Sequence, residues 1–328
     1  MTPYSYANDN NSVIINSTNL PKDWCNYLWS KDGYIGRFTQ AGHGESYHID
    51  AKANLCELNK NETRYLYLRD DDSNLSWNVG EAPLMEPVES FRCEHSIAYT
   101  KISSVKNEVK ASVLYFVPFN GFHEIWNVEI KNQSDRTKNL SMFSVVDFYL
   151  EGFQYPRYHE MFRALNAGFD NALNGVFCKS DHYYAPHDRY NAFLASTEPV
   201  FASDAHLKQF TGGTGSFSRP LMLLRGNNCT NSRRTCYDIG AVIQHKISLK
   251  PGESKSINIV YGMATSAKEA ADITNGLKTP GRVSELLQET SREMYGKYAT
   301  LSCNTPNERI NQLMNNWVKK TGRFLHCR

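Results

Sequence analysis

Only a few carboxylates in this 328-residue sequence stand where acid–base chemistry could use them. Asp147 lies inside the apolar run VVDFYL, and Glu151 opens the loop that follows. A carboxylic acid among apolar neighbours can stay protonated and donate its proton to a leaving group. The sequence nevertheless favours a hydrogen-bonded strand residue and a solvated loop residue, because neither carboxylate belongs to a convincing acid–base pair.

Patterns for binding phosphate or metal are weak. GGTG at 212–215 is not followed by the lysine and hydroxyl residue of a nucleotide-binding loop, so we interpret it as a turn. His182 and His187 lie in CKSDHYYAPHDRYNAF, where no third ligand has suitable spacing, and we expect a strand-edge role. The eight cysteines form no CxxC pair. We therefore expect reduced thiols, no metal site and no cofactor.

The segment EGFQYPRYHEMFRALNAGFDN, residues 151–171, is the stretch most typical of a functional loop. It is long, rich in aromatic residues and interrupted by proline and glycine. Tyr155, Tyr158 and His159 could offer their faces to the C–H groups of a pyranose ring, or they could pack within the loop. Both interpretations stay open.

Up to about residue 261, short alternating runs separated by turn residues indicate β-strands. In EIWNVEIKN, Trp126 and Val128 point to one side and Glu124 is among the polar neighbours. We expect this strand to pair with the apolar run LSMFSVVDFYL that follows. HKISLKPGESKSINIVYGM likewise predicts a hairpin around Pro251–Gly252. Many such strands without long helices between them predict two antiparallel sheets packed face to face.

After Gly262 the apolar period changes to that of a helix. Ser266 and Glu269 predict a capping box, and VSELLQETSREMYGKY predicts a second helix. A third helix is predicted to start at Thr305 and Pro306. Its apolar positions have the spacing of a helix packed on one face: Ile310, Leu313, Met314, Trp317 and Val318.

Composition excludes several classes of protein. A net charge of +2 argues against a dedicated nucleic-acid binder. No apolar run approaches the ~20 residues that span a membrane, and the N-terminus lacks the features of a signal peptide. We expect a cytoplasmic protein that binds neither nucleic acid nor membrane.

The order of several sequence blocks resembles a known family, the inverting disaccharide phosphorylases of glycoside hydrolase family 94, which include cellobiose and chitobiose phosphorylases. The blocks run through essentially the whole chain: NYLWSKDGYIGRFTQAGHGESYHIDAKANL, SFRCEHSIAYTKI, ASVLYFVPFNGFHEIWNVEIKNQSDRTKNLSMFSVVDFYL, SLKPGESKSINIVYG and TPNERINQLMNNW.

The resemblance implies a mainly-β fold, a large supersandwich like that of galactose mutarotase, joined by linker helices to an α/α barrel of six helical hairpins. It divides this chain into a β-sandwich domain at 1–264, a helical linker at 265–304 and the first barrel helix at 305–328. The family's catalytic aspartate and phosphate-binding residues would then lie beyond Arg328. The resemblance also implies a homodimer and inorganic phosphate as co-substrate.

Within the long loop, the block FRALNAG is similar to a family block with a glutamine–arginine pair. The resemblance places Arg163 on the family's arginine, which contributes to the sugar-binding end of the site, whereas Phe162 replaces the glutamine. This departure leaves the acceptor sugar open. A surface arginine paired with a nearby acid is the other interpretation of Arg163.

Two functional hypotheses follow. The first is the N-terminal, non-catalytic part of an inverting phosphorylase that cleaves a β-linked disaccharide or oligosaccharide. The second is a free-standing carbohydrate-binding β-sandwich. We expect the first to leave the apolar stripe of the last helix exposed or covered by self-association, and the second to bury it within its own chain.

Overall fold

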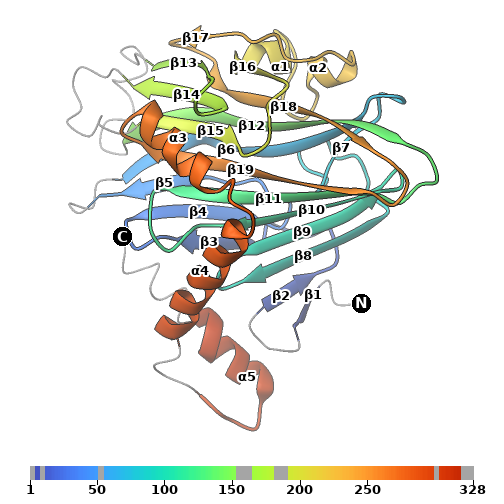
Figure 1. Ribbon diagram of the computed structural model, residues 1–328. Coiled ribbons are helices and arrows are strands. Elements are labelled where there is room, and N and C mark those ends of the chain that lie inside the picture. Colours follow the sequence, from blue (N-terminus) through green and yellow to red (C-terminus); the bar gives the residue numbers. More distant parts are fainter. Residues whose placement is uncertain are drawn as a thin grey trace.

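Two large antiparallel sheets facing each other form most of the molecule (Figure 1). The computed structural model describes residues 4–7, 12–50, 55–152, 165–180, 191–298 and 303–318. The predicted mainly-β class and two-sheet architecture are confirmed.

The eleven-stranded sheet has the order β1-β2-β8-β9-β10-β11-β19-β15-β14-β13-β17. Its strands are β1 (Tyr4–Tyr6), β2 (Ser12–Ile15), β8 (Ser90–Ser96), β9 (Thr100–Lys106), β10 (Val109–Phe116), β11 (His123–Asn132), β13 (Leu165–Asp170), β14 (Gly175–Ser180), β15 (Asn191–Ser196), β17 (Arg234–Thr235) and β19 (Ser254–Ala264).

The eight-stranded sheet has the order β16-β18-β12-β6-β5-β4-β3, with β7 paired to β6 outside this path. Its strands are β3 (Cys25–Trp29), β4 (Tyr34–Thr39), β5 (Ser46–Ile49), β6 (Leu55–Asp70), β7 (Ser76–Asn78), β12 (Lys138–Gly152), β16 (Ala202–His206) and β18 (Ile239–Leu249).

The main core lies between the sheets and takes alternate residues from both. Trp126 and Val128 of β11 are fully buried, as are Met142 and Val146 of β12, and all four belong to one apolar cluster. Alternation along a strand sends every second side chain to the same face, which explains this pattern. The predicted inward side of EIWNVEIKN is confirmed.

Two predicted strand pairings are wrong. β18 and β19, which flank Pro251–Gly252, belong to different sheets, and so do β11 and β12. β19 pairs with β11 and β15, whereas β18 pairs with β12 and β16. The chain therefore crosses between the sheets at both turns. An alternating pattern gives each strand one apolar face. The next strand along the chain can lie beside it in the same sheet or opposite it across the core, and both arrangements bury that face.

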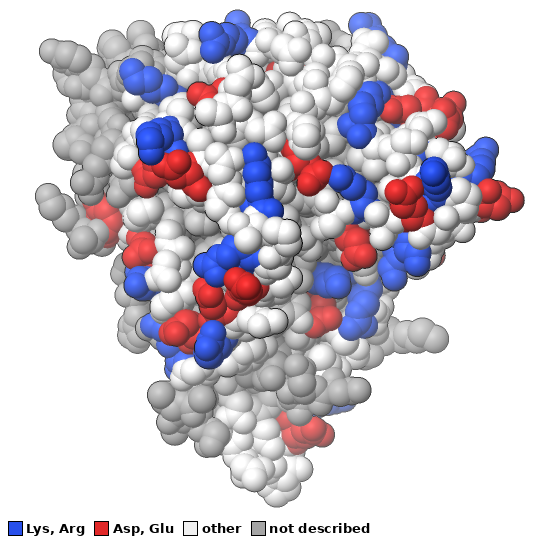
Figure 2. All heavy atoms as spheres, in the orientation of Figure 1, with Lys and Arg blue, Asp and Glu red and all other residues white. Residues whose placement is uncertain are grey.

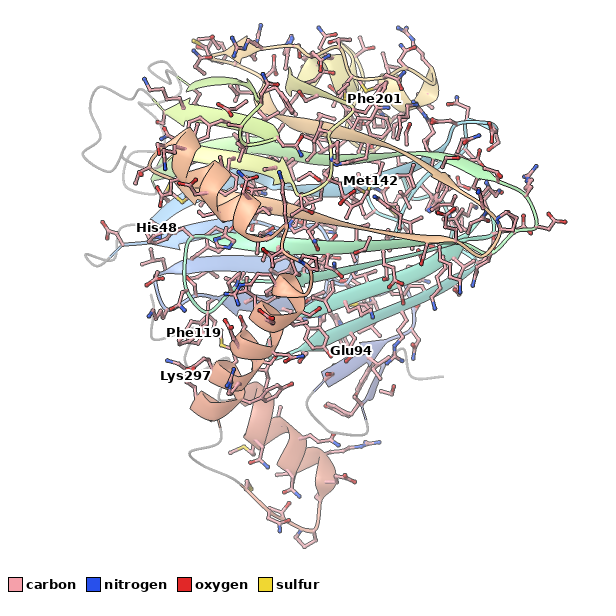
Figure 3. The ribbon with its side chains drawn as sticks, in the orientation of Figure 1. His48, Glu94, Phe119, Met142, Phe201 and Lys297 are labelled. Atoms are coloured by element: carbon pink, nitrogen blue, oxygen red, sulfur yellow. The ribbon has the colours of Figure 1, made fainter. Side chains whose placement is uncertain are left out.

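Helices cover the outer faces of the sheets. The short helices α1 (Leu207–Thr211) and α2 (Leu221–Leu224) pack against the eight-stranded sheet. The helices α3 (Ala267–Gly276) and α4 (Arg282–Tyr298) pack against the eleven-stranded sheet (Figure 1). Near the end of α4, the Lys297 ammonium lies 4.9 Å from the centre of the Phe119 ring (Figure 3).

The predicted start of α3 is confirmed. The hydroxyl of Ser266 accepts a hydrogen bond from the Glu269 backbone nitrogen at 3.2 Å. The Glu269 carboxylate in turn accepts one from the backbone nitrogen of Thr265 at 2.7 Å, one residue before the position expected for a capping box.

The last described helix begins later than the sequence suggested. α5 (Glu308–Gln312) continues into a π-helical turn (Leu313–Val318), and its N-cap is Asn307, not Thr305. The Asn307 side chain accepts from the backbone nitrogens of Arg309 and Ile310, because an asparagine oxygen reaches these donors as a threonine hydroxyl would. The Thr305 hydroxyl instead donates to the Asn307 carbonyl at 3.1 Å.

Three apolar side chains of the predicted stripe, one in α5 and two in the π-helical turn, are exposed to solvent. Ile310 is 45% exposed, Leu313 48% and Met314 42%. Figure 1 shows α5 beyond α4, at the end of the molecule that points away from the two sheets. The three-part division at residues 264 and 304 stays a prediction.

The distribution of charge on the surface agrees with the small net charge of the sequence. Basic and acidic side chains are interspersed over the face drawn in Figure 2, with no large region of one sign. Among the described residues, no helix is long and apolar enough to cross a membrane. Cys25, Cys93, Cys229, Cys236 and Cys303 are free thiols.

Candidate functional site

Irregularities in β6 and β12 open one end of the eight-stranded sheet. The two strands pair regularly up to Val146 and Arg64, and then the register shifts on both sides of Phe148. Asn61, Glu62 and Leu150 have positive φ angles of 53°, 56° and 49°. Bulges of this kind turn side chains away from the regular alternation and are frequent beside functional sites.

A cleft of about 440 Å³ lies at this end of the sheet. Its floor is apolar and includes Phe148, Leu207 and Ile239. The remaining lining residues are Asn61, Asp147, Leu165, Lys208, Thr211, Gly215, Ser216, Phe217, Cys236, Tyr237 and Asp238. An apolar floor with a few polar groups at the rim is typical of small-molecule sites.

Tyr65 connects the cleft to a second polar region. Its ring centre lies 5.6 Å from that of Phe217, which lines the cleft, and 6.4 Å from that of His43. Burial raises the pKa of Tyr65 to about 12, and the carboxylates of Glu62 and Asp147 add to the shift. The phenol therefore stays neutral at physiological pH and is a hydrogen-bonding group, not a base.

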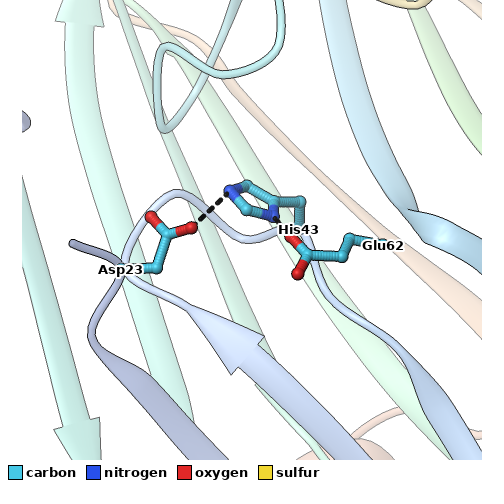
Figure 4. Close-up of side chains that lie close together, drawn as sticks. All are labelled: Asp23, His43 and Glu62. Atoms are coloured by element: carbon cyan, nitrogen blue, oxygen red, sulfur yellow. Dashed lines mark ion pairs between the residues drawn. The ribbon is translucent and has the colours of Figure 1, made fainter.

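The second region is a charge cluster centred on His43 (Figure 4). His43 Nδ1 lies 2.9 Å from a Glu62 oxygen, and Nε2 lies 3.9 Å from an Asp23 oxygen. The Arg37 guanidinium donates to Glu62 through Nη2 and to Glu45 through Nε at 3.1 Å. The hydrogen bond from His43, together with Arg37, lowers the pKa of Glu62 to about 2 against the opposing effect of burial.

Asp23, His43 and Glu62 also lie close enough to be considered as metal ligands. Two features favour a charge cluster over a metal centre. The Arg37 guanidinium already contacts Glu62, and a metal ion there would lie beside a fixed positive charge. His43 Nδ1 lies at hydrogen-bonding distance from the Glu62 carboxylate, 2.9 Å, so this nitrogen already has a partner.

A fully buried ion pair lies between the two sheets, near the charge cluster. The sequence analysis did not predict it. Arg64 of β6 and Glu124 of β11 both have fully buried side chains. Arg64 Nε donates to Glu124 Oε1 at 2.6 Å, and Nη2 donates to Oε2 at 2.9 Å. The sequence does indicate the burial of Glu124, because this residue stands two positions before Trp126 and therefore lies on the same, inward side of the strand. Its burial indicates a structural role.

Most of the predicted site residues cannot be placed. Arg163, Phe162, Tyr155 and Tyr158 lie outside the described residues, as does His159, and their assignments stay predictions. His182 and His187 also lie outside them. Leu165, the first described residue after this segment, lines the cleft.

The remaining candidates are placed. Asp147 is half-buried and lines the cleft. Glu151 belongs to β12 and does not begin a loop as expected, because its backbone continues the pairing with Glu57. GGTG forms a bend between α1 and α2: Gly212 follows α1 with a φ of 81°, and Gly215 lines the cleft.

Comparisons with known proteins agree on one family. The family model described as "Glycosyl hydrolase 94, supersandwich domain" matches residues 10–280. The solabiose phosphorylase of Paenibacillus borealis is 25% identical over 96% of this chain and 42% of its own length. The N,N'-diacetylchitobiose phosphorylase of Vibrio proteolyticus is 25% identical over 95% of this chain and 40% of its own length. The chain thus spans about two fifths of the length of these relatives.

A solved structure supports the fold. A bacterial glucoamylase complexed with acarbose superposes with a TM-score of 0.52 at 13% identity, covering 93% of this chain and 43% of the glucoamylase chain. At this identity the likeness concerns the fold alone.

Proposed function

Because the chain belongs to the glycosyl hydrolase 94 family through its supersandwich domain, we propose that it is the β-sandwich part of an inverting glycoside phosphorylase. The observation that carries this proposal is the family match over residues 10–280, combined with relatives that are more than twice as long. The relatives are named as phosphorylases of solabiose and of N,N'-diacetylchitobiose. We extend to the whole protein the reversible phosphorolysis of a β-linked disaccharide or oligosaccharide to a sugar 1-phosphate.

The chemistry of an inverting phosphorylase explains why we assign catalysis to residues outside this chain. A carboxylic acid must protonate the glycosidic oxygen while phosphate attacks the anomeric carbon from the opposite face, in a closed site with cationic and hydroxyl groups around the phosphate. Among the described residues, Asp147 and Asp238 lie at the rim of an open cleft, and Glu124 is buried against Arg64. None of the three offers a proton inside a closed anion-binding site.

We assign three roles to this chain within the whole enzyme. It provides a folded scaffold, it takes part in a homodimer, and it contributes Arg163 to the acceptor-sugar site, with Phe162 altering the specificity. Inorganic phosphate is the co-substrate of the whole enzyme. We also propose a cytoplasmic location, which the free thiols of Cys25, Cys93 and Cys229 support.

A free-standing carbohydrate-binding module is the alternative. The exposed side chains of Ile310, Leu313 and Met314 favour the phosphorylase part, because an independent module would be expected to bury this stripe in its own chain. We propose that another part of the enzyme covers the stripe.

Phosphorolysis assays test the proposal that the catalytic residues lie outside this chain. The purified 328-residue chain, incubated with phosphate and β-linked disaccharides, is expected to release no sugar 1-phosphate. Release that disappears on substitution of a carboxylate in this chain would contradict the proposal. In the whole protein, Arg163→Ala should weaken the use of disaccharide, and unchanged kinetics would remove Arg163 from the acceptor site.

A further inference from the structure

Tyr237 is an aromatic side chain held in solvent at the rim of the cleft. It is 63% exposed, although large aromatic residues are normally buried for most of their area. The other aromatic ring at the rim, Phe217, is half-buried and packs against Tyr65. Burial in the core therefore does not account for the position of Tyr237.

The backbone around Tyr237 is strained and firmly attached. Cys236 and Asp238, on either side of it, have positive φ angles of 73° and 54°. Few residues other than glycine adopt such angles, and they persist only where the surroundings impose them.

Three hydrogen bonds impose this conformation. The Cys236 nitrogen donates to the Leu165 carbonyl at 2.9 Å, and the Leu207 nitrogen donates to the Asp238 carbonyl at 2.9 Å. Arg234 Nε donates to the carbonyl of Tyr237 itself at 2.7 Å. The exposed ring thus stands on a preorganised turn, which lowers the entropy lost when a ligand binds.

The groups next to Tyr237 can bind hydroxyl groups. Asp238 offers carboxylate acceptors, Lys208 and Asn61 offer donors, and Ser216 can act as either. The rim charges are mixed, with Asp147 and Asp238 opposed by Lys208, which suits a neutral polar ligand better than an anion. The floor is apolar, as described above.

We propose that this cleft is a pyranose-binding subsite in which Tyr237 stacks on the C–H face of a neutral sugar ring. A pyranose combines an apolar face with a ring of hydroxyl groups, and the cleft offers a flat aromatic surface beside donors and acceptors. The choice of a sugar as ligand rests on the proposed function. The subsite itself is made of described residues and does not involve Arg163.

Direct binding tests the subsite. The 328-residue chain is titrated with cellobiose in phosphate-free buffer and followed by saturation-transfer NMR, with mannitol as a polyol that has no ring face. Cellobiose is expected to bind and mannitol is not. Tyr237→Ala should weaken cellobiose binding by about three- to tenfold, the range expected from the loss of one aromatic contact. Tyr237→Phe, which keeps the ring, should bind as the unaltered chain does.

Two further variants keep the test decisive. Phe201→Ala removes another exposed aromatic ring, 55% exposed and outside the cleft lining (Figure 3), and should leave binding unchanged. Asp238→Asn should weaken binding at least about threefold, and asparagine tolerates the positive φ, so the turn is retained. Thermal unfolding confirms that each variant is folded.

Three results would overturn the subsite: no cellobiose binding by the unaltered chain, equal binding by Tyr237→Ala, or an equal loss in Phe201→Ala. Because the assay contains no phosphate, these results are independent of whether the chain takes part in phosphorolysis. Failure of the subsite is thereby distinguished from failure of the proposed function.

Discussion

The buried ion pair between the sheets allows a quantitative prediction for Glu124→Gln. Five donors converge on the Glu124 carboxylate. Arg64 Nε and Trp126 Nε1 donate to Oε1 at 2.6 and 2.7 Å. Arg64 Nη2, the Ser46 hydroxyl and the Tyr34 hydroxyl donate to Oε2 at 2.9, 2.8 and 3.1 Å.

In Glu124→Gln, an amide nitrogen must replace one of the two oxygens. Depending on its orientation, one or two N–H donors of Arg64 and Trp126 then face another donor, and the Arg64 charge is left without its partner. A buried unsatisfied donor costs about 1–3 kcal/mol, and a buried pair that loses one partner costs about 3–5 kcal/mol. We therefore expect Glu124→Gln to lower the free energy of unfolding by about 3–5 kcal/mol, a large part of the roughly 5–15 kcal/mol of a typical domain.

Urea unfolding followed by tryptophan fluorescence and by circular dichroism measures this change. The matched control is Asp272→Asn, which removes a carboxylate from the exposed pair with Lys268 and should cause no measurable change. The double variant Arg64→Met/Glu124→Gln should recover part of the loss, because no charge remains buried and the amide oxygen still accepts from some of the neutral donors. A loss below about 1 kcal/mol in Glu124→Gln would refute the assigned role of the pair.

Three further predictions concern pH and the exposed helix. The pKa of Glu62 is about 2 in the folded chain and near its ordinary value of 4.5 when unfolded. Its contribution to stability is therefore complete above about pH 5 and is lost towards pH 2. The difference in free energy of unfolding between the unaltered chain and Glu62→Gln should become smaller over this range, and a constant difference would contradict the shift. Burial lowers the pKa of His245 to about 4, so the unfolded chain binds the additional proton and stability falls as pH drops from about 6.5 to 4. His245→Gln should show a shallower decline in unfolding experiments at these pH values, and an equally steep one would exclude His245 as the cause. Leu313→Glu should leave the melting temperature of the chain unchanged, because Leu313 is 48% exposed. The same variant should reduce self-association in sedimentation experiments. A clear drop in melting temperature would show that the stripe is buried within the chain.

Period-two alternation was sufficient to predict the class of the fold and the inward residues of individual strands. It could not assign partners to the strands. The pattern around Pro251–Gly252 is the same for a hairpin and for a turn that carries the chain from one sheet to the other, since both bury Ile247 and Ile257. Strand pairing is decided by contacts that are distant in sequence, such as Trp126 with Ile259.

The candidate site was less predictable than the fold for the same reason. Tyr237 and Asn61 belong to unrelated stretches of sequence, and only bulges and turns with positive φ bring them to one cleft. Asp147 was recognised because it interrupts an apolar run. Glu124 was classed as polar and outward, although its spacing from Trp126 places it on the inward side of the strand.

The position of β19 has a consequence for how the protein is made. Along the chain it is the last of the strands that the structure describes, yet it lies in the middle of the eleven-stranded sheet, between β11 and β15. During synthesis, two separate half-sheets, each with an unpaired edge, persist until β19 has left the ribosome. Chaperone binding to the nascent chain should therefore be strongest just before β19 emerges, and release should follow its insertion.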